Sequence, residues 1–348
     1  MSGKRQHFIP QFLQKGFTDQ LNGDKVWVYR KGAKSFDTNT LNSGVEGYFY
    51  SQDGDNQVDE AITEIEKRFS TLVDTLRNNH DEVTADSLTI AEAIAHFEIR
   101  TRHIRQSFCN TAEYMVEAMF KLMDEPDAWG KVLRTRAPSF VRARAIKEFN
   151  KLSIPQKMLK PFLILTEPLI EKEIQKIILN MPLFTSLARL GVKNNFQDSI
   201  KLGHLDGLRN TIVPQVKVNI YRNMQFSVMR TAVDIPLGDS IVVFKLSGDR
   251  QFKPICDKDD PIEAVYLPLS KNLVLVGKFT NKNLDISNLP TAIAQCSLEF
   301  FISSSKNSTN DNLQSHIGEY AYFLSEEQIS NMLIDLINEM TEVGNVNF

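Results

Sequence analysis

The sequence predicts an α+β protein, and two shifts in residue pattern carry this prediction. Apolar residues recur at helical spacing from residue 57 to about 212, whereas β-branched and aromatic runs bounded by turn residues dominate from about 213 onward. With 348 residues, of which 42% are hydrophobic and 24% charged, the chain is long enough to bury a large core. We therefore expect a helical bundle packed on a mostly antiparallel or mixed β-sheet, with N-terminal strands and a C-terminal helix.

Three regions follow from these shifts. Residues 1–56 hold an N-terminal HxxP segment and short strands, residues 57–212 hold the helical bundle, and residues 213–348 hold a β-rich region that ends in a helix. Because helices are needed to cover a sheet that is apolar on both faces, we expect the regions to form one integrated domain.

The N-terminal region begins with an apolar stretch around His7 and Pro10, which we expect to dock on the body of the protein. Residues 25–30 alternate in the manner of a strand, and residues 48–50 predict a second one. Turn-prone segments at 31–34 and 42–44 separate them, so a small sheet or hairpin is predicted here.

The middle region predicts long helices. One begins after the turn-forming segment 53–56 and presents an amphipathic face, and a second begins at Thr84 or Asp86 and runs to about residue 122. Prolines are expected to divide the remainder into shorter helices, since proline removes a helical hydrogen bond. These prolines are Pro138, Pro155, Pro161, Pro168 and Pro182.

The C-terminal region predicts five strands at residues 216–221, 226–229, 241–244, 264–267 and 273–276. Several are apolar on both faces, which is typical of strands inside a covered sheet. A capping-box pattern predicts a final helix over 325–337, and the biased segment 303–312 predicts a flexible loop.

Composition limits the classes of function. A formal net charge of −3 leaves no global positive field to attract a polyanion, so dedicated DNA packaging is not expected. The three cysteines are far apart in sequence, which predicts neither a disulfide framework nor a thiolate zinc site and fits a cytoplasmic protein. No apolar run predicts a membrane span, and no Gly-rich phosphate loop, nucleophile elbow or dinucleotide motif is present.

Two segments near the start resemble signatures of DUF4238, a bacterial family of unknown function. The opening resembles its HxxPxFxLxxF signature, and the strand that follows is similar to its VWVYxK strand. The first long helix resembles its YS…VE…E pattern, with aspartate where the first glutamate is usual. The matching positions are His7, Pro10, Phe12, Leu13, Phe17, 26–31, Tyr50, Ser51, Val58, Asp59 and Glu66.

Later segments extend this resemblance over nearly the whole chain. Residues 99–105 are similar to the family's RTPxxR helix, but they lack its proline, and Phe97 stands where glutamine is usual. Residues 230–237 resemble its fxTSDxPv strand and turn, and residues 266–270 resemble its xPLs strand. The resemblance implies a shared fold and carries no established activity.

The residues in these segments suit phosphodiester hydrolysis. Asp59 and Glu66 are seven residues apart and share one helix face, and Asp234 follows a predicted strand. Three carboxylates could hold Mg²⁺ or Mn²⁺, a histidine could move a proton, and two arginines could bind phosphate. This hypothesis is a metal-dependent nuclease in phage defence or a related conflict, with His7, Asp59, Glu66 and Asp234 as catalytic or metal residues and Arg100 and Arg105 on phosphate.

A non-catalytic binding or sensor protein is the alternative. In that case Arg100 and Arg105 pair internally with Asp59 or Glu66, and His7 is a satisfied structural histidine. Either way, a structural role is expected for Pro10, Gln11 and Pro236.

A basic cluster could contact nucleic acid or a protein partner, or could be a solvated helix face. It comprises Arg134, Arg136, Arg142, Arg144 and Lys147. The sequence leaves the oligomeric state open.

Overall fold

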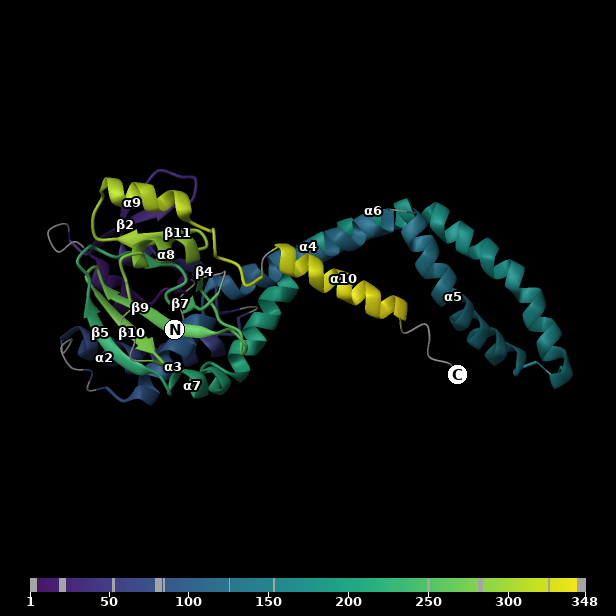
Figure 1. Cartoon of the computed structure of the whole chain (residues 1–348), viewed down its shortest axis with the longest axis horizontal. Coiled ribbons are helices and arrows are strands. Elements are labelled where there is room, and N and C mark those ends of the chain that lie inside the picture. Colours follow the sequence, from purple (N-terminus) through teal and green to yellow (C-terminus); the bar gives the residue numbers. More distant parts are fainter. Residues whose placement is uncertain are drawn as a thin grey trace. The chain divides into compact units, whose positions relative to one another are not determined.

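The computed structural model shows two compact units (Figure 1), each described here by itself. The first comprises residues 1–108 and 199–323, and the second comprises residues 109–198 and 324–348. The structure describes residues 5–18, 23–51, 54–78, 83, 85–124, 126–152, 154–248, 251–280, 284–324 and 326–342.

A five-stranded antiparallel sheet forms the centre of the first unit. Its strands are ordered β5-β10-β9-β7-β8, and every neighbouring pair is antiparallel. The strands are β5 (Gln225–Arg230), β7 (Val243–Leu246), β8 (Phe252–Lys253), β9 (Ile262–Ser270) and β10 (Leu273–Lys278). Antiparallel pairing and the accompanying helices confirm the predicted α+β class.

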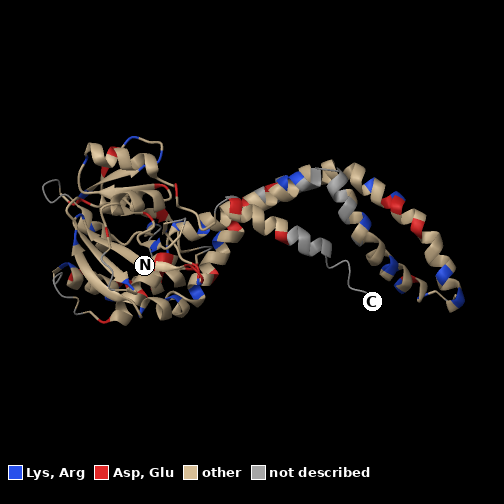
Figure 2. Cartoon of the chain, viewed as in Figure 1, with Lys and Arg blue, Asp and Glu red and all other residues tan. Residues whose placement is uncertain are grey.

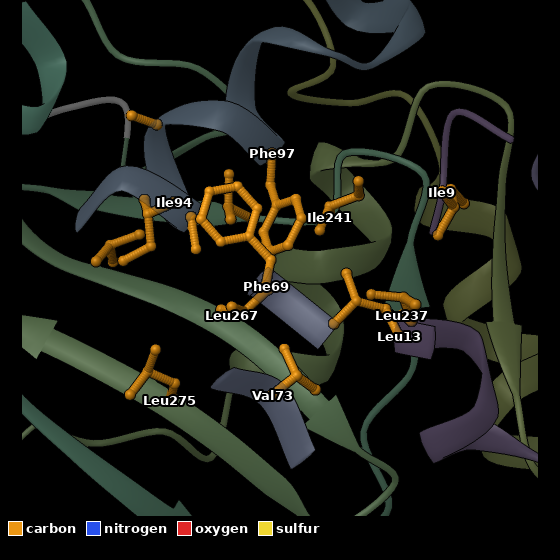
Figure 3. Packing of buried hydrophobic residues seen from close by; sticks show 14 of the residues in the cluster. Ile9, Leu13, Phe69, Val73, Ile94, Phe97, Leu237, Ile241, Leu267 and Leu275 are labelled. Carbon is orange, nitrogen blue, oxygen red and sulfur yellow. The ribbon is translucent and has the colours of Figure 1, made fainter. Parts of the chain in front are cut away.

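One face of this sheet is covered by helices α2 (Gln57–Asn78), α3 (Ser87–Ile99) and α7 (Gln215–Tyr221). Side chains alternate along a strand, so Val265, Leu267 and Leu269 of β9 point to this helical face. Phe69 of α2 and Phe97 of α3 meet edge to face at 5.7 Å in the same core (Figure 3).

The opposite face packs against α8 (Leu289–Cys296). The intervening side chains Ala264 and Tyr266 of β9, with Val274 and Val276 of β10, belong to this second core together with Ile293 of α8. The sheet is therefore apolar on both sides, as the sequence predicts.

A second sheet of four strands has the order β3-β2-β11-β6, and a two-stranded ribbon pairs β1 with β4. The strands of the four-stranded sheet are β2 (Lys25–Arg30), β3 (Phe36–Asn39), β6 (Leu237–Gly238) and β11 (Phe300–Ser303). The ribbon joins β1 (Arg5–His7) and β4 (Val45–Gly47). Short helices complete the unit: α1 (Gln11–Gln14), η1 (Lys15–Phe17), η3 (Thr40–Asn42), α9 (Ser308–Leu313) and η5 (Gln314–His316).

The N-terminal segment is docked as predicted. Ile9, Leu13 and Phe17 are fully buried, and the guanidinium of Arg77 on α2 holds α1 in place. Arg77 donates to the carbonyl oxygen of Phe12 at 2.9 Å and to that of Leu13 at 3.0 Å. Because the last carbonyls of a helix lack intrahelical partners, this arginine caps α1 from a distant part of the chain.

The second unit is helical. Helix α4 (Arg102–Asp124) begins in the first unit and continues into the second, which also holds α5 (Pro126–Phe149), η4 (Gln156–Met158), most of α6 (Leu159–Asn210) and α10 (Glu326–Glu342). Acidic and basic residues both occur along α6 (Figure 2). Within the described residues, no helix is both long and apolar enough to span a membrane.

The helix starts largely agree with the sequence. Helix α2 begins at Gln57, whose backbone N–H donates to the carboxylate of Asp55. Asp86 is the N-cap of α3, and its carboxylate accepts from the backbone N–H of Thr89. The alternative start at Thr84, together with Asp53 of the start signal and Ser325 of the capping box, lies outside the described residues.

One predicted strand is wrong. Residues 216–221 form helix α7, because Pro214 supplies its N-cap and the helical spacing of Val218 and Tyr221 buries both side chains. Val216, which a strand would have placed on the same face as Val218, is 70% exposed. Helix α7 packs on α3, so tertiary packing overrides the β-branched pattern.

Other boundaries also differ from the prediction. Residues 48–50 form a turn, in which Tyr48 adopts a φ of 53°, and the strand lies just before it at β4. Residues 303–312 contain the end of β11 and most of α9, which Asn307 caps. Pro168 and Pro182 lie inside the continuous α6, and Pro138 lies inside α5, so these prolines do not end their helices.

Candidate functional site

Arg100 is the centre of the polar cluster in the first unit. Helix α3 ends at Ile99, α4 begins at Arg102, and Arg100 occupies the junction with φ −83° and ψ −9°. This break divides the long helical stretch that the sequence predicts between residues 84 and 122 into α3 and α4. The side chain is only 1% exposed, so its charge must be compensated inside the protein.

The guanidinium group of Arg100 is compensated by partners from three other elements. It donates from Nε to the hydroxyl of Tyr50 at 3.1 Å, from Nη2 to the carbonyl oxygen of His7 at 2.6 Å, and from Nη1 to the carboxylate of Glu66. A longer contact of 3.4 Å joins Nη1 to Nε2 of His96, one turn earlier on α3. Since a guanidinium has about five N–H donors, these four contacts nearly exhaust it.

Tyr50 closes this arrangement. Its hydroxyl donates to the carbonyl oxygen of Arg100 at 2.9 Å while accepting from Nε of the same residue. Burial raises the pKa of Tyr50 to about 12, so the hydroxyl keeps its proton at neutral pH. The tyrosine therefore locks both the side chain and the backbone at the junction of α3 and α4.

His7 lies at the end of β1, partly exposed. Its Nε2 is 3.3 Å from the carbonyl oxygen of Thr40 and 3.2 Å from the side-chain nitrogen of Gln11. Burial lowers the pKa of His7, an effect that the Thr40 carbonyl and the negative charge of Glu66 oppose. Gln11 thus contacts the His7 ring, and Pro10 is the N-cap of α1; the structural role of both stays a prediction.

Asp59 lies beside the same network. Gln6 is buried and accepts from the backbone N–H of Tyr50 at 2.6 Å, and its side chain also bonds Asp59. Burial raises the pKa of Asp59, and the nearby negative charge of Glu66 raises it further. The two carboxylates therefore share one region, as their spacing on α2 predicts.

Arg105 forms a neighbouring pair with a histidine. Its Nε donates to Nδ1 of His204 at 2.8 Å, its Nη2 donates to the carbonyl oxygen of Phe49, and the guanidinium lies 4.0 Å from the centroid of the Phe49 ring. Nε2 of His204 donates to the carbonyl oxygen of Ile99 at 2.9 Å. Burial, and then the positive charge of Arg105, lower the pKa of His204 to about 4.

Asp234 has different surroundings from the other predicted site residues. It is exposed in the turn after β5, where the backbone N–H of Ile235 donates to the carbonyl oxygen of Lys271 at 2.7 Å. The partners described for His7, Glu66 and Arg100 do not include it. Pro236, two residues later, is buried.

The arrangement restricts what the cluster can bind. Among the described residues, no group of three or more His, Cys, Asp or Glu side chains could hold a metal ion. A phosphate at Arg100 would have to displace the carboxylate of Glu66 from a guanidinium that is almost fully buried.

A second buried ion pair was missed by the sequence reading. Glu98 is fully buried, and its carboxylate accepts from Nζ of Lys217 at 2.5 Å, from the hydroxyl of Tyr221 at 2.7 Å and from the backbone N–H of Cys256 at 2.8 Å. Burial raises the pKa of Glu98, which the Lys217 charge opposes. The available signal was a carboxylate set between the apolar residues Phe97 and Ile99 of helix α3.

Comparison with known proteins gives a family and no activity. A family model described as a protein of unknown function (DUF4238) matches residues 5–341. No curated protein and no solved structure gave a match.

Proposed function

Because the chain belongs to the DUF4238 family, whose description assigns no activity, we propose from the geometry of the first unit that it is a non-catalytic binding or sensor protein. In this proposal the residues of the family signatures form an internal polar network. The observation that supports it is the engagement of Arg100 with Tyr50, Glu66, His96 and the His7 backbone.

The physical argument is one of competition. A buried arginine that is already paired holds its partners by charge-assisted hydrogen bonds, and replacing them would leave a carboxylate uncompensated. Arg105 is likewise engaged by His204 and by the carbonyl oxygen of Phe49. Both arginines therefore hold elements together, which suits a rigid binding scaffold better than a phosphate clamp.

The basic cluster that the sequence singles out belongs to α5. Arg142, Arg144 and Lys147 are exposed there, and Arg134 contacts Glu171 at 3.2 Å. The side chain of Arg136 lies outside the described residues. In this proposal these cations are the region where an acidic protein or a nucleic acid would bind.

A metal-dependent phosphodiester hydrolase is the second candidate, and one observation favours it. His7, Asp59 and Glu66 are all partly exposed, and the charge of Glu66 acts on both of the others. Mg²⁺ or Mn²⁺ would have to bind the two carboxylates with further oxygen ligands. A nuclease role in phage defence stays a prediction from the sequence.

One experiment separates the two candidates. The purified chain is incubated with DNA, RNA and a generic phosphodiester, with Mg²⁺ or Mn²⁺ or with a chelator, beside the variants Glu66→Gln and Asp234→Ala. The proposal expects no metal-dependent cleavage and a lower melting temperature for Glu66→Gln. Metal-dependent cleavage that is lost in a variant of unchanged melting temperature would establish the hydrolase instead.

Glu64→Gln is the matched control for these variants. Glu64 lies on the same helix as Glu66, and its exposed carboxylate pairs with Lys67 three residues along. Since surface ion pairs contribute only about 0–1 kcal/mol, this control should leave both the melting temperature and any cleavage unchanged.

A further inference from the structure

The first unit contains a cavity of about 300 Å³ that the Arg100 network does not use. It lies between the beginning of α4, helix α7 and the loop around residue 256. Its walls are mainly apolar, with side chains of Ile104, Phe108, Val216, Ile220, Ile262 and Phe323. A mostly apolar cavity of this size, with a few convergent polar groups, is typical of a small-molecule site.

The polar groups of the cavity belong to the second buried ion pair. Lys217, Tyr221 and Cys256 line it, and all three contact the buried carboxylate of Glu98 behind them. Glu98 therefore fixes the position of the lysine ammonium. Such a fixed donor at an apolar wall can orient a ligand with little loss of side-chain freedom.

The ammonium of Lys217 has capacity beyond these internal contacts. It donates to the carboxylate of Glu98 at 2.5 Å and to the carbonyl oxygen of Cys256 at 2.6 Å, and no third acceptor contacts it within the described part of the chain. An ammonium has about three N–H donors. One donor is thus without a described partner, on a side chain that lines the cavity and is 21% exposed.

The charges around the cavity indicate a ligand without net charge. Lys217 is paired with Glu98, and the neighbouring Lys253 is paired with Asp260 at 2.7 Å. At the rim, Lys258 and Asp257 are both exposed. The cations and anions around the cavity are balanced, so the protein offers no unpaired charge to a charged ligand. Burying such a ligand among apolar walls would therefore be unfavourable.

We propose that this cavity binds an uncharged, mainly apolar small molecule with one oxygen that accepts a hydrogen bond from Lys217. A volume of 300 Å³ corresponds to about ten water molecules at about 30 Å³ each, so the ligand has about ten non-hydrogen atoms. This inference rests on the proposed binding function and names the chemistry of its ligand.

Three probes of nearly equal size test the ligand chemistry. Acetophenone carries an uncharged acceptor oxygen, benzoate carries an anionic head, and isopropylbenzene carries no acceptor. Binding to the full chain is measured by ligand-observed NMR titration. Acetophenone is expected to bind most tightly; equal or tighter binding of benzoate, or no saturable binding of acetophenone, would overturn the proposal.

A pair of tryptophan variants tests the location. Val216 lines the cavity and is 70% exposed, whereas Val233 is 57% exposed and does not line it. Val216→Trp is expected to weaken acetophenone binding about tenfold or more, equivalent to about 1.4 kcal/mol, and Val233→Trp to leave it unchanged. Equal affinities for the two variants would place the ligand elsewhere and overturn the site.

The role of the lysine has its own test. Lys217→Met is expected to abolish the preference for acetophenone over isopropylbenzene, because the donor is lost while the apolar walls remain. A retained preference would remove Lys217 from the proposal. If this variant does not fold, the two tryptophan variants decide the location alone. Failure of these titrations leaves the cleavage experiment unaffected, so this inference and the proposed function can fail separately.

Discussion

Two buried ion pairs lie two residues apart at the end of α3, and they use their donors differently. Arg100 pairs with Glu66 and has four contacts, with side chains of three residues and one backbone carbonyl. Lys217 pairs with Glu98, has two acceptors among the described residues, and borders a cavity of about 300 Å³. Four contacts on a side chain that is 1% exposed indicate a structural role, whereas an ammonium with two acceptors beside open volume indicates a site.

The difference has a physical origin in the two cations. A guanidinium is planar and presents a fork of donors that can join several chain segments at once, so Arg100 connects β1, α2 and the turn at Tyr50. An ammonium is a compact point charge on a flexible stem, and among the described residues Lys217 reaches Glu98 and the backbone of Cys256.

The largest expected effect is that of Arg100→Met. It leaves Glu66 without its partner and removes the bonds to Tyr50 and the His7 backbone, and breaking a buried pair lowers the free energy of unfolding by about 3–5 kcal/mol. Urea denaturation measures it. Arg68→Met, which removes a half-exposed partner of Glu92, is the control and should change the value by about 1 kcal/mol or less. Equal losses for the two variants would contradict the structural role of Arg100.

Glu98→Gln is expected to have the next largest effect. The amide keeps the shape of the carboxylate but removes the charge that compensates Lys217, and hydrogen bonds to charged groups contribute about 1.5–3 kcal/mol to stability. The same denaturation experiment measures the loss. The loss of unfolding free energy should be smaller than for Arg100→Met, because Lys217 is 21% exposed and can be solvated through the cavity. A larger loss than for Arg100→Met would contradict the order of the two ion pairs.

A pH-dependent effect is expected from His204. Its pKa is about 4 in the folded chain against the usual 6.5, so the unfolded chain binds more protons between these values and stability falls as the pH drops from 6.5 toward 4. The contribution is about 2 kcal/mol at pH 5, taking about 1.4 kcal/mol per pKa unit. His204→Gln should therefore flatten the pH dependence of the unfolding free energy.

His316→Gln is the control for that measurement. His316 is a partly exposed histidine beside Glu319, so its substitution removes an imidazole that is not deeply buried, and the difference between the two variants isolates the effect of burial at His204. Buried Glu98 and Asp239 have raised pKa values and act with the opposite sign, so the comparison uses the difference between variants. An unchanged slope in His204→Gln would show that this histidine is not held neutral.

The smallest expected effect is that of Asp59→Asn. Burial disfavours the charged carboxylate, and the amide can keep the contact with Gln6, so the free energy of unfolding should change by about 0.5 kcal/mol or less. Thermal unfolding measures it. A loss comparable with that of Glu98→Gln would mean that Asp59 carries charge in the network.

The sequence predicts the sheet well because a period of two is a local signal. Residues of β9 and β10 alternate between the two cores, as the apolar runs require. The sequence wrongly predicts a strand at α7. Val216, Val218 and Ile220 have the period of a strand, but Pro214 and packing on α3 favour the helix. Local patterns cannot report a preference set by a distant neighbour.

The site was predictable only in part for a similar reason. Helical spacing places Asp59 and Glu66 together, and the motif order suggests that His7 and Arg100 join them. Pairing of Glu98 with Lys217 joins residues 119 positions apart, one of which was assigned to a strand. No spacing rule could reveal it, and the exposed Asp234 was grouped with the cluster on composition alone.

A double-mutant cycle between Arg100→Met and Glu66→Met tests the central claim most directly. Residues that act through one buried network couple by about 0.5–3 kcal/mol, so the unfolding free energies should be non-additive by more than about 1 kcal/mol. Full additivity, within about 0.3 kcal/mol, would show that the two side chains do not stabilise the fold together and would contradict the account.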